Sequence, residues 1–141
     1  MVYKRIRLPF HDFEFFKQSK SCLGYGLKGF GVFQEDKMVA VRLVLCFNSN
    51  IYDWYAGAMD DYLSLRPNDI LPWELMKYGV KNGYKSFDFG GAGKPNVPYG
   101  VRDFKLKFGG ELVEFGRFQK IHKPNLMYLA KIGLTLYKKI K

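Results

Sequence analysis

The sequence predicts a single α+β domain, with a mixed, largely antiparallel sheet flanked by helices. Strand-like apolar and aromatic runs follow one another between residues 30 and 57, with short polar turns between them. Two stretches with helical spacing begin at Pro67 and at Pro124. A chain of 141 residues fits one domain and contains no internal repeat or linker, so residues 1–141 are expected to fold as one unit.

The first three strands are predicted to form a meander. Phe30–Phe33 and Met38–Phe47 are separated by the polar residues 34–37, which is typical of a hairpin. The turn 48–50 leads to an aromatic-rich strand at Ile51–Gly57. Consecutive strands joined by such short turns pair in antiparallel order.

A helix is predicted after the meander, with Asn68 or Asp69 as its cap and Asn82-Gly83 at its end. Lys85–Phe89 follows as a strand beside the meander. The core face of the helix is expected to consist of Ile70, Trp73, Leu75, Met76 and Val80.

Three further segments have less regular patterns. Glu111–Gln119 is predicted to form a final strand or a bent hairpin. A basic amphipathic helix begins at Pro124 and either packs against the sheet or lies on a membrane. Residues 1–28 form either an arm for a partner or a short helix, whose aromatic residues would pack on the sheet: Phe13, Phe15 and Phe16.

The charge is concentrated in the second half of the chain. The net charge is +10; residues 1–70 carry 9 Lys and Arg against 8 Asp and Glu, whereas residues 71–141 carry 14 against 5. This excess suits a polyanionic partner such as RNA or an anionic membrane face, and a solvated basic surface is the simpler alternative.

Composition also limits the classes of site and location. Cys22 and Cys46 are not in a CxxC pair and are expected to be reduced. The two histidines, His11 and His122, lack ligand spacing with the cysteines and carboxylates, so we expect no metal. We also expect no tightly bound cofactor. No window approaches the roughly 18 apolar residues of a membrane span, and no secretory signal is evident. We expect a cytoplasmic protein, either free or at the inner membrane face.

Several short motifs occur in a characteristic order: Tyr55-Ala56-Gly57-Ala58, the helix with Trp73, Asp88-Phe89-Gly90-Gly91, and Phe104-Lys105 followed by Phe108-Gly109-Gly110. In this order they resemble the C-terminal acyltransferase domain of FemAB-type proteins, the GNAT-like transferases that add amino acids to peptidoglycan precursors. The resemblance covers roughly Gly29 to the C-terminus. It implies a GNAT-like fold, amide formation on an amine, and a lipid-linked or nucleotide-linked sugar-peptide as acceptor.

The chain departs from that family in two respects. Family members typically have two such domains and an inserted helical arm, whereas this chain holds about one N-terminally abbreviated domain. A second GNAT-like domain or a homodimer is therefore an expected partner. Acetyl-CoA enzymes of the fold also place a glycine-rich pyrophosphate loop where this chain has Ala58–Arg66, which contains no glycine. Aminoacyl-tRNA is therefore favoured over acyl-CoA as the donor.

The strongest candidates for chemistry surround the glycine loop that follows residue 89. Lys105 is predicted to bind a donor phosphate or the oxyanion that develops, a role that the resemblance also implies. Asp88 either accepts the proton of the amine, directly or through water, or caps the following turn. Gly90 and Gly91 allow the backbone to approach a ligand closely.

A second possible anion site lies at the start of the predicted helix. Arg66, together with the N–H groups after Asn68, either clamps a phosphate or carboxylate or pairs with Asp60 or Asp61.

Other candidates would orient the substrates. Tyr62 and Tyr99 have hydroxyls on predicted loops, which either orient an acceptor or pack. Phe104 and Phe108, interleaved with basic residues such as Arg102, form either a stacking platform for a tRNA base or part of the core.

Three hypotheses about function follow from these observations. The first is a FemAB-like acyl or aminoacyl transferase that forms an amide bond, in peptidoglycan precursor or cell-envelope modification. The second is an acyl-CoA-dependent N-acyltransferase of the GNAT type. The third is a non-catalytic basic half-domain that binds RNA or a partner subunit, whose affinity would fall steeply with salt.

Overall fold

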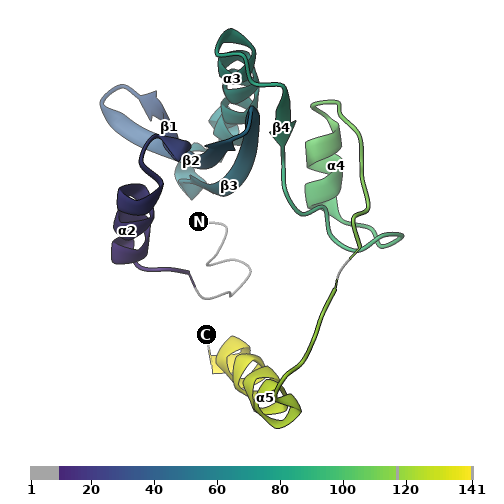
Figure 1. Ribbon diagram of the computed structural model, residues 1–141. Coiled ribbons are helices and arrows are strands. Elements are labelled where there is room, and N and C mark those ends of the chain that lie inside the picture. Colours follow the sequence, from purple (N-terminus) through teal and green to yellow (C-terminus); the bar gives the residue numbers. More distant parts are fainter. Residues whose placement is uncertain (1–9, 117, 141) are drawn as a thin grey trace.

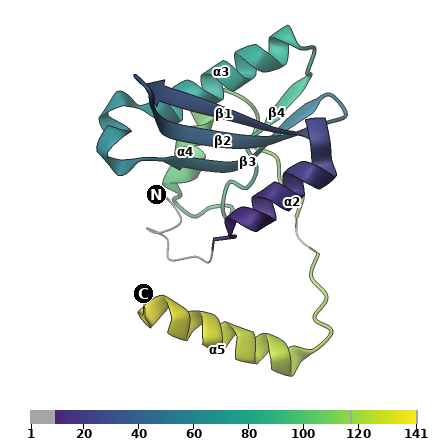
Figure 2. The same cartoon turned by 90° about the vertical axis from the view of Figure 1, so that its left-hand side faces the viewer.

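The computed structural model describes residues 10–116 and 118–140, and it confirms the predicted α+β class (Figures 1 and 2). Its sheet has the strand order β1-β2-β3-β4. The first two pairs are antiparallel and the pair of β3 and β4 is parallel, so the sheet is mixed. The four strands are β1 (Leu27–Gln34), β2 (Lys37–Phe47), β3 (Asn50–Ala58) and β4 (Ser86–Asp88).

The meander is confirmed, and its turns use left-handed backbone conformations. Glu35 lies between β1 and β2 with φ 53°, and Asn48 and Ser49 lie between β2 and β3 with φ 46° and 63°. Such conformations reverse the chain within two residues. The three strands therefore pair with their neighbours in sequence.

A bulge in β3 changes which of its side chains lie on each face of the sheet. Leu43 pairs with Tyr55, but the next residue of β2, Val44, pairs with Asp53, so Trp54 is the extra residue. Because an extra residue interrupts the alternation of side chains, Asp53 and Tyr55 lie on opposite faces of the sheet.

Helix α2 (Phe13–Leu23) covers one face of the sheet (Figure 2). Asp12 caps it by accepting a 2.9 Å hydrogen bond from Phe15 N. Phe16 contacts Tyr55 edge to face, with ring centroids 5.1 Å apart. The prediction of a short helix that packs its aromatics on the sheet is thus confirmed for Phe15 and Phe16, whereas Phe13 is 80% exposed and residues 1–9 lie outside the described part.

Helix α3 (Pro67–Lys81) covers the opposite face (Figure 2). The predicted caps are wrong, because the helix begins directly at Pro67 and is preceded by Arg66 in a left-handed conformation with φ 53°. Proline suits the first helical position, where an N–H would have no intrahelical partner. The core between α3 and the sheet consists of two buried clusters: Ala40, Ala58 and Leu71, and Val44, Ile51 and Leu75.

The predicted core face of α3 is largely wrong. Leu75 is buried as expected, but Trp73 is 58% exposed and Val80 is 81% exposed. The helix approaches the sheet closely at Gly79, where a Cβ would lie 3.2 Å from the Ile51 side chain. The buried residues of α3 are Pro67, Leu71, Pro72, Leu75 and Gly79.

Beyond the edge strand β4 the chain forms a loop and then the short helix α4 (Gly100–Leu106), which lies beside the end of β4 (Figure 1). Two 3₁₀ helices occur earlier in the chain: η1 (Gly24–Gly26) before β1 and η2 (Asp60–Leu65) between β3 and α3.

The C-terminal region differs from the prediction. Residues 111–116 and 118–119 form neither helix nor strand, and Gly109, Gly110 and Gly116 have positive φ values that interrupt an extended chain. The predicted helix is present as α5 (Pro124–Ile140), but it lies apart from the sheet in both views (Figures 1 and 2). Its exposed leucines include Leu126, Leu129 and Leu136. The expectation that it packs on the sheet is therefore wrong.

Candidate functional site

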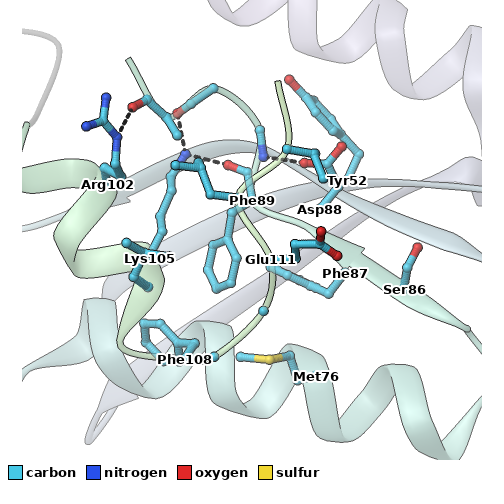
Figure 3. A pocket seen from close by; sticks show the side chains of 18 of the residues that line it. Tyr52, Met76, Ser86, Phe87, Asp88, Phe89, Arg102, Lys105, Phe108 and Glu111 are labelled. Carbon is cyan, nitrogen blue, oxygen red and sulfur yellow. Dashed lines mark hydrogen bonds between the residues drawn. The ribbon is translucent and has the colours of Figure 1, made fainter. Parts of the chain in front are cut away.

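The candidate site lies where the parallel strands β3 and β4 separate. Their pairing ends at Tyr52 and Asp88, and the chain after β4 turns toward α4. The space beside this fork is a pocket of about 800 Å³. Its walls come from β3, α3, β4, the glycine loop, α4 and the segment after α4, and they include Tyr52, Met76, Asp88, Gly90, Gly91, Arg102, Lys105, Phe108 and Glu111 (Figure 3).

Lys105 reaches from α4 to the glycine loop (Figure 3). Its Nζ donates to the backbone oxygens of Phe89, at 2.5 Å, and Gly91, at 2.7 Å. An ammonium group has three donors, so one N–H is left for a ligand after the two bonds that the described residues provide. The cation thus holds the loop and faces the pocket at the same time.

Arg102 lies one helical turn before Lys105 and holds the next part of the same loop. Its Nε donates to Ala92 O at 2.9 Å, Nη1 donates to Val97 O at 3.1 Å, and Nη2 donates to Lys94 O. A planar guanidinium donates from three separate nitrogens in a fixed arrangement, so it can bond acceptors that are farther apart than those a single ammonium nitrogen can reach. Arg102 lines the pocket, and its contacts within the described residues fix the shape of the loop.

Asp88 closes the turn that opens the glycine loop. Its Oδ1 accepts a 2.7 Å hydrogen bond from Gly90 N, which is the capping role considered above. Gly90 has φ 68°, a conformation that favours glycine. The second carboxylate oxygen of Asp88 remains available at the pocket wall for a proton or an ammonium group.

Burial and nearby charges act on the pKa of Lys105 in opposite directions. Removal from water lowers its pKa from the ordinary value, because the charged form loses hydration. Asp53 opposes this shift most strongly, Arg42 adds to it, and Asp88 opposes it weakly. Charges that lie in the sheet therefore influence the pKa of Lys105.

The pair Arg42 and Asp53 was not among the residues singled out from the sequence. Arg42 Nη1 lies 2.5 Å from Asp53 Oδ2, and the two side chains are only 5% and 10% exposed. Burial raises the pKa of Asp53, against the attraction of Arg42 and Lys105. A recognisable signal exists, since each residue is a charge whose neighbours on both sides in its strand are apolar or aromatic.

The other predicted residues lie outside the lining of this pocket. Arg66 and Asn68 are at the start of α3, where Arg66 Nε bonds Asp69 Oδ2 at 3.3 Å. Tyr62 lies in η2, beneath the ammonium of Lys37 at 4.9 Å. Tyr99 packs against Gly93 in the glycine loop, and Phe104 contacts Phe108 edge to face at 5.3 Å.

The described part of the chain contains neither a metal-binding cluster nor a membrane-spanning helix. No group of three or more His, Cys, Asp or Glu side chains that could hold a metal ion occurs there. None of the helices in residues 10–116 and 118–140 has the length and apolar character needed to cross a bilayer.

Similarity to known proteins is found over most of the chain. The model of the FemAB family matches residues 30–134. A lipid II:glycine glycyltransferase of Staphylococcus haemolyticus is 32% identical over 94 residues, which cover 63% of this chain and 22% of that protein. A protein of the same description from Staphylococcus epidermidis is 30% identical over 94 residues, 63% of this chain and 23% of its own length. The match thus spans less than a quarter of these relatives, and no solved structure matches.

Proposed function

The chain belongs to the FemAB family, and from this premise we propose that it forms an amide bond by transferring an aminoacyl group to an amine of a peptidoglycan precursor. The observation that carries the proposal is the Lys105 ammonium, which is held at the pocket wall by two backbone oxygens and retains an N–H for a ligand.

The proposed reaction needs positioning and charge stabilisation more than a strong base. The amine nitrogen of the acceptor attacks the ester carbonyl of the donor, the new C–N bond forms, and the ester C–O bond breaks as the alkoxide leaves. The Lys105 N–H stabilises the oxyanion that develops on the carbonyl. Asp88 takes the proton that the amine loses. This proton then passes to the leaving oxygen, directly or through water.

We propose aminoacyl-tRNA as the donor. The connection between β3 and α3, residues 59–66, contains no glycine, so it offers a poor cradle for the pyrophosphate of an acyl-CoA. The basic excess of residues 71–141 suits a polyanionic donor. The GNAT-like fold is part of this proposal and is supported by the parallel fork of β3 and β4 beside a pocket.

We propose a lipid-linked sugar-peptide as the acceptor, as the name of the relatives suggests. Helix α5 supports an arrangement at the inner face of the membrane. It presents exposed apolar residues such as Leu126 and Leu129, and Lys131 lies on another side of the same helix. An apolar face flanked by lysines suits the surface of an anionic bilayer.

A second folded unit is also part of the proposal, either another GNAT-like domain or a second copy of this chain. Several large apolar side chains after α4 are exposed, including Phe115 at 91% and Phe118 at 100%. Their burial by a second unit would complete the wall of the pocket, to which Phe115 contributes.

The test is a transfer assay with the intact chain, charged tRNA and the lipid-linked precursor in anionic vesicles, run in parallel with acetyl-CoA. We expect amide formation from charged tRNA. Efficient transfer of acetyl groups with no use of charged tRNA would overturn the choice of donor in favour of an N-acyltransferase.

Variants at α4 separate catalysis from folding. Lys105→Met should lower turnover by about 10²-fold to 10³-fold, as loss of an oxyanion donor does. Lys107→Met removes an exposed lysine from the end of the same helix and should leave turnover unchanged. Salt-sensitive binding of RNA without transfer, equal in the two variants, would instead support the non-catalytic half-domain.

A further inference from the structure

The buried pair of Arg42 and Asp53 is unusual, because the core clusters between the sheet and α3 are otherwise made of apolar residues. Arg42 lies on the same face of β2 as Ala40 and Val44, which belong to the two core clusters under α3. Within the described residues Arg42 Nε and Asp53 Oδ1 have no hydrogen-bond partner. Unpaired polar atoms in such a place are costly to the fold, so their presence calls for a reason beyond packing.

The pair lies directly behind the fork. Tyr52 and Asp88 are the last paired residues of β3 and β4, so Asp53 is the first residue after this pair that has no partner in β4. Phe89 is the corresponding next residue after β4, and it is the backbone oxygen of Phe89 that accepts from Lys105 Nζ. Adjacent strands lie about 5 Å apart where they are paired. The register therefore places Phe89, whose oxygen accepts from Lys105 Nζ, at the same end of the fork as Asp53.

We propose that Asp53 is a positioning residue, the buried counter-ion that keeps Lys105 charged and directed at the glycine loop, and that Arg42 fixes its carboxylate in place. This inference rests on the proposed function, in which the charged form of Lys105 acts on the donor. Asp53 does not line the pocket, so it acts through Lys105 and not on a substrate.

The charges around Lys105 agree with this role. Asp53 from β3 and Asp88 at the end of β4 favour its charged form, whereas Arg42 from β2 and burial disfavour it. Two further charged residues line the same pocket: Arg102 on the same helix, whose guanidinium is bound to loop oxygens, and Glu111 on the segment after α4. Asp53 is the most effective of the groups that hold Lys105 protonated.

The decisive experiment is a pH titration of Lys105 by NMR, with ¹³Cε-labelled lysine and the signal assigned by its absence in Lys105→Arg. Asp53→Asn should lower the pKa of Lys105 by about one unit, the lower end of the effect of a nearby opposite charge. Arg42→Gln should raise it. General loosening of the fold would move both variants in the same direction, toward the value of a solvated lysine.

A second measurement keeps the inference testable if Asp53→Asn does not fold. In an Asp88→Asn background, the Lys105 signal should show an additional inflection at acidic pH as Asp53 takes up its proton, because Asp53 is then the remaining carboxylate among the groups that act on Lys105. Absence of this inflection, or an unchanged Lys105 pKa in Asp53→Asn, would overturn the inference.

The titration needs neither donor nor acceptor, so its failure is distinct from failure of the proposed function. If transfer is observed, Asp53→Asn should also lower kcat and move the alkaline limb of its pH profile downward with that pKa, with little change in KM. A fall in kcat with an unmoved pH profile would indicate a structural role alone.

Discussion

Substitution of Gly93 tests whether the glycine loop has the conformation described above. Gly93 has φ 77°, and a Cβ built there would lie 2.6 Å from Cδ1 and 3.0 Å from Cγ of Tyr99. These ring atoms are the ones nearest the backbone of Tyr99, so they can avoid the methyl group only if the ring leaves its χ1 rotamer or the residue itself moves. Tyr99 precedes α4, and its backbone oxygen accepts from Arg102 N at 2.8 Å.

The expected cost of Gly93→Ala has two parts. The left-handed conformation costs a non-glycine residue about 1–2 kcal/mol, and forcing an extra methyl group into a filled space costs about 1–3 kcal/mol. The sum is about 2–5 kcal/mol, unless the loop detaches locally at a lower cost and leaves the sheet folded. In either case the start of α4, and with it Lys105, is displaced from the loop.

Gly91→Ala is the matched control in the same loop. A Cβ at Gly91 meets no atom within 4 Å, and its φ is outside the left-handed region. Alanine should therefore be tolerated there, and it can stabilise the fold by about 0.4–1 kcal/mol through the unfolded state. Urea unfolding followed by circular dichroism measures both variants, and NMR shifts of α4 report local detachment. Equal stabilities together with unchanged α4 shifts in the two variants would refute the reasoning.

Three other perturbations have definite expected outcomes. Leu75→Ala should lower the free energy of unfolding by about 2–5 kcal/mol, because Leu75 is 0% exposed, whereas the exposed Leu65→Ala should change it by about 0.5 kcal/mol or less in urea unfolding. The side-chain hydrogen bond with Cys46, and then burial, raises the pKa of Tyr84 to about 12 from 10.0. The folded state therefore retains this proton at a pH where the unfolded state loses it, so the contribution of Tyr84 to stability should be lost as pH rises from 10.0 to about 12, and ¹³Cζ-tyrosine NMR of Cys46→Ala should show a lower Tyr84 pKa. Arg102→Lys should lower the heteronuclear NOE values of the glycine loop while global stability changes by only about 1 kcal/mol, because the three backbone oxygens are bonded by three separate guanidinium nitrogens and lysine has a single donor nitrogen.

The parts of the fold that depend on local sequence could be predicted. The turn residues and the alternating runs located the three strands of the meander to within a few residues. The position of α3 was also correct, but its buried face was not, because large apolar residues were taken as the core. Gly79 lies against Ile51 and Trp73 faces outward, and such a choice depends on how closely helix and sheet approach, which periodicity does not encode.

The same distinction applies to the candidate site. Lys105, Asp88, Gly90, Gly91 and Arg102 were singled out from the sequence, and the structure brings them to one pocket because they belong to a single continuous segment of strand, loop and helix. The contribution of the sheet was missed, since Arg42 and Asp53 meet only through the pairing of β2 with β3 and the bulge at Trp54. Arg66 and Asn68, at the far end of α3, required the path of the helix to be known.

The short parallel pairing of β3 and β4 also has a consequence for the order in which the molecule assembles. The meander forms from neighbouring segments, but β4 returns to β3 after a long excursion, and the hydrogen bond between Ser86 and Asn50 joins residues 36 positions apart. Closing such a loop costs chain entropy before its three residue pairs contribute, so we expect β4 to dock late in folding and to open early under native conditions. The pocket exists only while β4 is docked, so any ligand that fills it will stabilise the docked position of β4. Native-state hydrogen exchange should therefore show slower exchange of the β4 amides when the ligand is bound.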